Sequence, residues 1–230
     1  EDEDIILINK PVGMLSQKAA RSDESLVEHL ISYLVQSHAL TEEDLRTFRP
    51  SICNRLDRNT SGIVAAGKSM ALSQMFHDRT IGKYYLCLTA GIIEKPSRVE
   101  GWLFKDERTN KVEILFQERP GSARIITEYR PIKSHDGVTL LEVHLITGKT
   151  HQIRAHLASV GHPLIGDHKY GASQINREYE QKYHLQSQLL HAARLQFPVC
   201  TQTLCNVSKK EFTAPLPKQF YRIAAEKGVL

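Results

Sequence analysis

The chain has 230 residues, of which 41% are hydrophobic, so it can bury a core as one domain or as two closely joined domains. No apolar run approaches the roughly 18 residues of a membrane-spanning helix, and no secretory signal opens the chain. Its four cysteines show neither a disulfide framework nor zinc-binding spacing, which is typical of a reducing compartment. We therefore expect a soluble, cytoplasmic protein.

The net charge of +4 is unevenly distributed. Residues 1–48 carry ten acidic and four basic side chains, whereas residues 49–230 carry 16 acidic and 26 basic ones. A basic body suits a polyanionic partner such as RNA, although a solvated basic surface is the commoner meaning of such an excess. Charge alone is therefore a weak indication of function.

The N-terminal part reads as alternating elements. An apolar strand is predicted over 4–9, a helix over 24–37, and a short helical turn from Thr41. A further apolar strand follows over 62–67, and Ser69 is the expected cap of the next helix.

Four strand signals come next, over 83–91, 111–117, 123–131 and 138–146, without helices between them. Such an order favours antiparallel pairing and an α+β fold rather than a doubly wound sheet. We expect Thr150 to cap a helix over 151–160 with Ile153, Leu157 and Val160 as its buried stripe. A polar helix, a strand and an amphipathic helix complete the chain, over 174–188, over 189–197 and at the C-terminus.

The segment Arg55–Gly62 places one carboxylate, Asp57, between Arg55 and Arg58. Two guanidinium groups favour the charged form of a carboxylate, which can then act as a nucleophile, a base or an electrostatic partner for a cation. For an isolated motif, a salt-bridged surface turn is the commoner reading. The other motifs of the chain decide between these readings.

Residues 62–69, GIVAAGKS, match the P-loop string of nucleotide triphosphatases letter for letter. A P-loop, however, needs a strand before its first glycine and a phosphate-wrapping loop after it. Here the four middle residues are themselves an apolar strand, and no later apolar run ends in an aspartate for magnesium. We consider a triphosphatase a remote alternative.

A cluster of histidines near Asp167 suggests a metal site, since imidazoles and carboxylates are common ligands. Ligands on one helix must be three or four residues apart to share a face, and His151 and His156 are five apart. We therefore expect no metal there.

Taken together, the motifs resemble a known family. Residues 55–62, RLDRNTSG, resemble the H-R-L-D-R-x-T-S-G signature of the RluA family of pseudouridine synthases. Residues 148–157, continuing to Tyr170-Gly171, resemble the second long signature of that family. Shorter pieces at 9–13, 83–85, 190–192 and 214–217 fall in the matching order, so the resemblance covers nearly the whole chain. Asn54 departs from the pattern, because the family usually has histidine there.

The resemblance implies an isomerase that converts uridine within RNA to pseudouridine and needs neither cofactor nor metal. It implies that Asp57 is the catalytic aspartate, that Arg154 pairs with it, and that Tyr85 stacks on the target base. Tyr84 is expected on the opposite face of its strand. The implied fold is a mixed, mainly antiparallel sheet with flanking helices and a central basic cleft.

The resemblance also implies substrate contacts. Arg55 would enter the space that the flipped nucleotide leaves, Leu190 would line the uracil pocket, and Lys10 would contact phosphate or support the site. Arg58 and Gln152 are further expected substrate contacts.

The expected partner is RNA, with 23S ribosomal RNA favoured and transfer RNA as the alternative, and the expected state is a monomer with no membrane contact. Residues 1–230 would be the catalytic domain, and the resemblance is compatible with an S4-like RNA-binding domain upstream of it in the natural protein. A non-catalytic RNA-binding relative is the rival hypothesis from another class.

Overall fold

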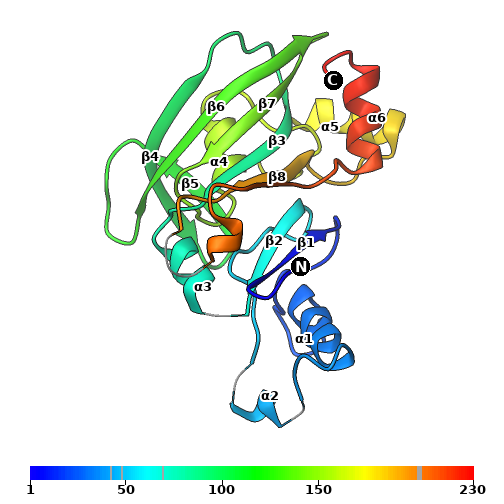
Figure 1. The fold of residues 1–230 in the computed structure, drawn as a ribbon. Helices are drawn as coiled ribbons and strands as arrows, with labels where there is room; N and C mark the ends of the chain where they lie inside the picture. The colour runs from blue at the N-terminus through cyan, green and yellow to red at the C-terminus, as the bar shows by residue number, and fades with distance from the viewer. Residues whose placement is uncertain (42, 48, 69, 201–203) are drawn as a thin grey trace. The chain divides into compact units, whose positions relative to one another are not determined.

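Two units make up the chain, residues 1–81 with 195–214 and residues 82–194 with 215–230. The computed structural model describes residues 1–41, 43–47, 49–68, 70–200 and 204–230. Figure 1 shows the helices and strands of both units along the chain. Within the described ranges, no helix has both the length and the apolar character that crossing a membrane requires.

The first unit is built on two antiparallel strands, β1 (Ile5–Lys10) and β2 (Ser61–Gly67). Consecutive apolar side chains of both strands point in turn to opposite faces, so each face packs with a different helix. Figure 1 shows helix α1 (Leu26–Gln36) beside the two strands, and its Leu30 and Leu34 pack with Ile6 of β1. Both strands thereby become part of the core.

The other face of β1 and β2 packs with α3 (Met70–His77), whose Leu72 and Phe76 contact a cluster containing Ile5 and Ile63. The remaining elements of this unit are α2 (Asp44–Thr47), the 3₁₀ turn η1 (Cys205–Val207) and β9 (Glu211–Thr213). The expected cap of α3, Ser69, lies outside the described residues.

The second unit contains a sheet in the strand order β8-β3-β7-β6-β4-β5. Neighbouring pairs from β3 to β5 are antiparallel. Its strands are β3 (Gly82–Ala90), β4 (Ser97–Asp106), β5 (Lys111–Leu115), β6 (Ala123–His135), β7 (Val138–Leu145) and β8 (Leu190–Gln196), the last two residues of β8 belonging to the first unit. The expected α+β fold with a mainly antiparallel sheet is confirmed.

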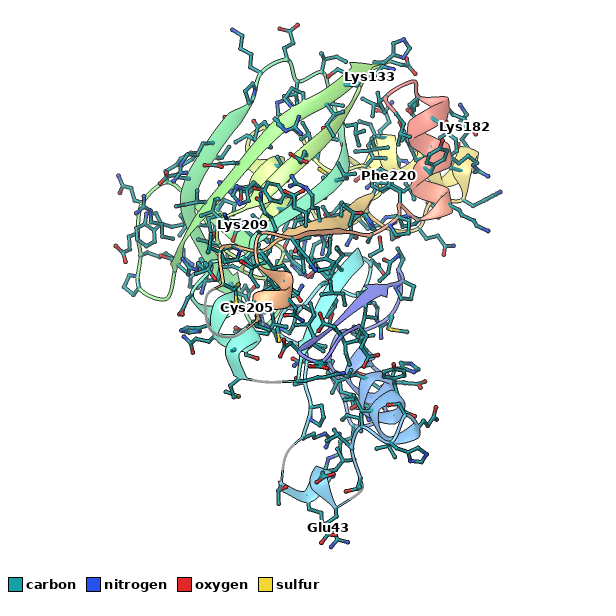
Figure 2. All side chains as sticks on the ribbon, viewed as in Figure 1. Glu43, Lys133, Lys182, Cys205, Lys209 and Phe220 are labelled. Carbon is teal, nitrogen blue, oxygen red and sulfur yellow. The ribbon has the colours of Figure 1, made fainter. Side chains whose placement is uncertain are left out.

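Helices cover both faces of this sheet. Helix α4 (Gln152–Ser159) packs Ala155 against Ile125 of β6, on one face. Leu88 and Leu140 point to the opposite face and join a cluster with α5 (Ser173–Tyr183) and α6 (Lys218–Glu226). Phe220, which Figure 2 labels on α6, is 2% exposed within that cluster.

Three sequence predictions need correction. Strand β4 was not predicted, because its charged residues and exposed positions hide the apolar alternation. Helix α4 starts after His151, which adopts a left-handed conformation, and Thr150 is not its cap. The expected stripe on α4 is also wrong in part, since Val160 is exposed while every residue from Gln152 to Leu157 is buried.

Candidate active site

The Asp57 segment is an irregular loop that leads into β2, and it is fixed to the turn after β1. The buried Ser16 hydroxyl donates to the carbonyl of Leu56 over 2.8 Å and accepts from the Leu56 N–H over 3.0 Å. The carbonyl of Arg58 accepts from the Gly13 N–H over 2.9 Å. Leu56 and Arg58, the two chain neighbours of Asp57, are thus both held by hydrogen bonds to their backbone groups.

Lys10 lies beneath this loop and is fully buried. Its ammonium group donates to the carbonyls of Pro11, Met14 and Arg58 over 2.8 to 3.1 Å. Burial lowers the pKa of Lys10 to about 8, and the nearby charge of Asp57 opposes that effect. An ammonium has three N–H donors, and all three are used, so Lys10 supports the loop in this structure. Its expected contact with phosphate stays a prediction.

Asn54, which stands where the resembling family has histidine, has a structural role in this chain. Its Oδ1 accepts from the Ala65 N–H over 2.8 Å, and its Nδ2 donates to the Ile63 carbonyl over 3.2 Å. The side-chain amide therefore pairs with β2 as a strand residue would. Asn54 ties the start of the Asp57 loop to the buried strand that follows it.

The half-buried Asp57 has exposed arginines on both sides, Arg55 and Arg58. The carbonyl of Asp57 accepts from the Thr60 N–H over 3.0 Å, which closes a tight turn. Two guanidinium groups at the solvent-facing side of a fixed loop are suited to contact a polyanion. Their expected role as substrate contacts stays a prediction.

In the second unit, the strand register separates two rows of side chains. Tyr85 lies opposite Val143, which lies opposite Tyr129, whereas Tyr84 lies opposite His144, which lies opposite Glu128. Because side chains alternate along a strand, the two rows point to opposite faces. The expected separation of Tyr84 from Tyr85 is confirmed.

Helix α4 covers the face that carries Tyr85. His156 and Gln152 both contact the hydroxyl of Thr127, two residues before Tyr129 on β6 and therefore on the same face as it. Tyr85 is 6% exposed and Arg154 of α4 is 8% exposed. The structure thus brings the helix of Arg154 and the ring of Tyr85 to one face of the sheet. The predicted pairing of Arg154 with Asp57 joins residues of different units and stays a prediction.

Gln152 is held by four hydrogen bonds within the protein. Its Nε2 donates to the Ile126 carbonyl and to the Thr127 hydroxyl. Its Oε1 accepts from the Thr147 hydroxyl and from the Lys149 N–H. These four bonds use both donors and both lone pairs of the amide. The predictions that Gln152 and Leu190, which is buried on β8, contact the substrate stay untested.

Arg154 has a carboxylate partner that the sequence did not single out. Its Nε donates to Oδ2 of Asp167 over 2.7 Å and its Nη2 donates to Oδ1 over 2.9 Å. The ring centre of Tyr170 lies 5.3 Å from the guanidinium carbon. Arg154 and Asp167 are 13 positions apart in the chain, and this spacing by itself does not indicate an ion pair.

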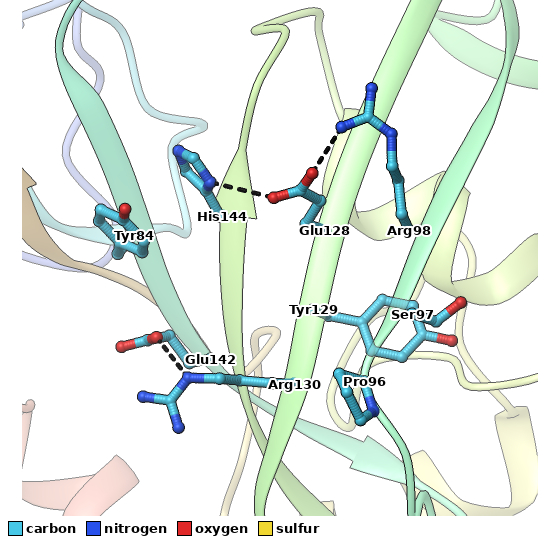
Figure 3. A pocket seen from close by; sticks show the side chains of 9 residues that line it. All are labelled: Tyr84, Pro96, Ser97, Arg98, Glu128, Tyr129, Arg130, Glu142 and His144. Atoms are coloured by element: carbon cyan, nitrogen blue, oxygen red, sulfur yellow. Dashed lines mark hydrogen bonds and ion pairs between the residues drawn. The ribbon is translucent and has the colours of Figure 1, made fainter.

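A pocket of about 450 Å³ lies on the other face, in front of the Tyr84 row. Figure 3 shows Glu128 between Arg98 and His144, and Glu142 beside Arg130. The hydrogen bond from Arg98 lowers the pKa of Glu128. Burial opposes this effect, and the hydrogen bond with His144 adds to it. This pocket does not contain any of the predicted site residues.

The two histidines considered for a metal site, His151 and His156, bind different neighbours. Nδ1 of His151 contacts the Tyr170 hydroxyl, and Nδ1 of His156 contacts the Thr127 hydroxyl. Among the described residues, no group of three or more His, Cys, Asp or Glu side chains could hold a metal ion. The residues of the P-loop string from Gly62 to Gly67 lie in β2, as the strand reading required.

Comparison with known proteins gives the family. The sequence model of the RNA pseudouridylate synthase family matches residues 4–159. The chain belongs to this family, and the resemblance read from its sequence is confirmed.

Among curated relatives, the ribosomal large subunit pseudouridine synthase D of Zymomonas mobilis is 32% identical over 86% of this chain and 63% of its own length. The protein of the same name from Borreliella burgdorferi is 27% identical over 96% of this chain and 65% of its own length. The chain therefore spans less than two thirds of these two relatives.

Solved structures share the fold. Human RNA pseudouridylate synthase domain containing 4 aligns with a TM-score of 0.78 and 20% identity, covering 99% of this chain and 91% of that one. Human RNA pseudouridylate synthase domain containing 1 aligns with a TM-score of 0.64 and 21% identity, covering 100% and 93%.

Proposed function

We propose that this protein converts uridine to pseudouridine within RNA, with Asp57, Tyr85 and Arg154 as its catalytic residues. Family membership and the fixed loop that presents Asp57 carry the proposal. In the reaction, the bond between N1 of uracil and C1′ of ribose breaks, and a bond between C5 and C1′ forms. The proton of C5 is lost and N1 gains one, so the base is isomerised without net gain or loss of atoms.

An ionised Asp57 suits two routes to this exchange. In one route the carboxylate adds to C1′ as a nucleophile, and in the other it removes a sugar proton to give a glycal. Both routes require a charged carboxylate in a fixed position. The clamp of Ser16, Lys10 and Asn54 on the surrounding loop supports that requirement.

The favoured substrate is large-subunit ribosomal RNA, because several relatives are ribosomal large subunit pseudouridine synthases. Transfer RNA is the alternative. We propose that the exposed Arg55 and Arg58 contact the RNA at a basic cleft, and that Leu190 lines the base pocket. We further propose that the protein is a monomer and lies in the cytoplasm. Its four cysteines, which form no disulfide, suit that reducing compartment.

Tritium release from RNA labelled at C5 of uridine tests this proposal, with 23S ribosomal and transfer RNA transcripts as separate substrates. The wild-type chain should release tritium from one of them, and Asp57→Asn should lower the rate by at least about 1000-fold, since the reaction requires that group. Asp78→Asn, an exposed carboxylate after α3, is the matched control and should keep the wild-type rate.

Two outcomes contradict the proposal. RNA binding with no tritium release from either transcript indicates the non-catalytic relative. Phosphate release from ATP that Lys68→Ala abolishes would instead support the triphosphatase.

A further inference from the structure

The loop that follows α4 is unusually tightly packed around one carboxylate. A Cβ atom on Gly166, which has a φ of +81°, would lie 2.2 Å from the carbonyl oxygen of Ser187. A Cβ atom on Gly171 would lie 2.2 Å from the carbonyl oxygen of Asp167 itself. Only glycine fits at either position, so the backbone on both sides of Asp167 is closely constrained.

The Asp167 side chain is completely buried and is held from three directions. Besides its two bonds from Arg154, Oδ1 accepts from the N–H groups of Lys169 and Tyr170 over 2.8 and 3.1 Å. Burial alone would raise the pKa of this carboxyl, but the hydrogen bonds and charge of Arg154 hold it below its ordinary value. Asp167 is therefore a charged group in a position that the fold determines.

A second residue fixes the backbone of this loop without touching the charge. Asn176 of α5 accepts from the Gly166 N–H and donates to the Asp167 carbonyl, each over 2.8 Å. Its side chain thus bridges the two residues that lead into the carboxylate. This arrangement separates the loop's stability, to which Asn176 contributes, from the charge that Asp167 provides.

The bidentate contact also fixes the direction of Arg154. A guanidinium is planar and has five N–H donors, and Asp167 takes one on Nε and one on Nη2. The three other N–H bonds point away from Asp167, in the same plane. Because burying a guanidinium charge is costly unless a carboxylate pairs with it, Asp167 determines both the plane of Arg154 and its tolerance of burial.

We propose that Asp167 is a positioning residue, which acts through Arg154 by directing that guanidinium towards the catalytic carboxylate. The inference rests on the proposed function, in which Arg154 pairs with Asp57. Asp167 itself does not touch the substrate. Its loss should therefore impair the chemical step rather than the binding of RNA.

Single-turnover kinetics of tritium release test this inference. Asp167→Asn keeps the shape of the side chain and an acceptor for the backbone N–H groups, but it removes the charge that holds Arg154. We expect the rate constant to fall about 100-fold, the loss that a displacement of about 1 Å can cause, while the dissociation constant for RNA stays within about threefold. The matched control, Asn176→Ala, should lower the melting temperature but keep the rate within about threefold.

A double-mutant cycle separates positioning from a purely structural role. If Asp167 acts through Arg154, then Asp167→Asn should cause little further loss of rate in an Arg154→Ala background. Additive losses would overturn the inference. So would an Asn176→Ala variant that loses as much rate as Asp167→Asn when both are folded.

A spectroscopic measurement tests, independently of catalysis, whether Asp167 positions the guanidinium of Arg154. In nitrogen-15 spectra of the full chain, the Nε–H signal of Arg154 should be resolved and slow to exchange in the wild type and in Asn176→Ala, and lost in Asp167→Asn. A signal that is unchanged in Asp167→Asn overturns the positioning role. Absence of tritium release by the wild type, with this spectral pattern present, refutes the proposed function but leaves the fixed guanidinium established.

Discussion

His156 makes the stability of the second unit depend on pH. The ring is 1% exposed, its Nδ1 contacts the Thr127 hydroxyl over 2.9 Å, and its Nε2 is buried without a hydrogen-bond partner. Burial lowers the pKa of His156 to about 4, from an ordinary value of 6.5. Between these two values the unfolded chain binds the proton and the folded chain does not, so the free energy of unfolding falls as the pH falls.

The size of this effect follows from the shift. At about 1.4 kcal/mol for each pKa unit, the contribution of His156 is about 3 kcal/mol, fully present above pH 6.5 and lost as the pH approaches 4. His156→Gln removes the titrating group, so its free energy of unfolding should fall less over that range than that of the wild type. Other groups titrate equally in both proteins and cancel in the difference.

Urea unfolding at several pH values between 7.5 and 4 measures this difference. Trp102, the single tryptophan of the chain, lies on β4 in the same unit and provides the fluorescence signal. His77→Gln, which changes an exposed histidine, should follow the wild type at every pH. Equal pH dependence in the wild type and in His156→Gln would refute the assignment of this effect to His156.

Two further predictions concern the loop that presents Asp57. Lys10→Met leaves the carbonyls of Pro11 and Met14 without this donor and removes one of the two donors to the Arg58 carbonyl. Each buried unpaired group costs about 1–3 kcal/mol, so urea unfolding should show a large loss of stability together with lost tritium release. A variant as stable as the wild type would contradict the supporting role. Asn54→Ala removes both bonds to β2 and should cost about 2 kcal/mol in the same assay, whereas Asn59→Ala, two residues after Asp57 and outside these bonds, should cost much less.

Most of the fold could be predicted from the sequence because local patterns carry it. The alternation of Leu141, Val143 and Leu145 marked β7, and the helical spacing of Leu30 and Leu34 marked α1. Strand β4 escaped detection because its charged residues Arg98 and Glu100 form ion pairs with side chains of the neighbouring strand β6. Such pairs depend on strand register, which no local pattern gives.

The surroundings of polar residues were harder to predict than the elements. Lys10 and Gln152 were expected to contact the substrate because of the resemblance to the family, although lysine and glutamine are usually exposed and burial could not be read from the sequence. In the structure both are buried, and each uses its full hydrogen-bonding capacity within the protein. The difference arises because burial is a property of the packed chain, and it decides whether a polar group faces the substrate or supports the backbone.

The sequence by itself determined the family, most of the strands and helices, and Asp57 as the residue to explain, since long motifs and periodic patterns are properties of neighbouring positions in the chain. Only the tertiary structure decided which charges meet. The contact between Arg154 and Asp167 exists because a loop with two required glycines returns to α4 and buries a carboxylate beside a guanidinium. Two opposite charges taken out of water must pair, and the fold, not the spacing, selects the partner.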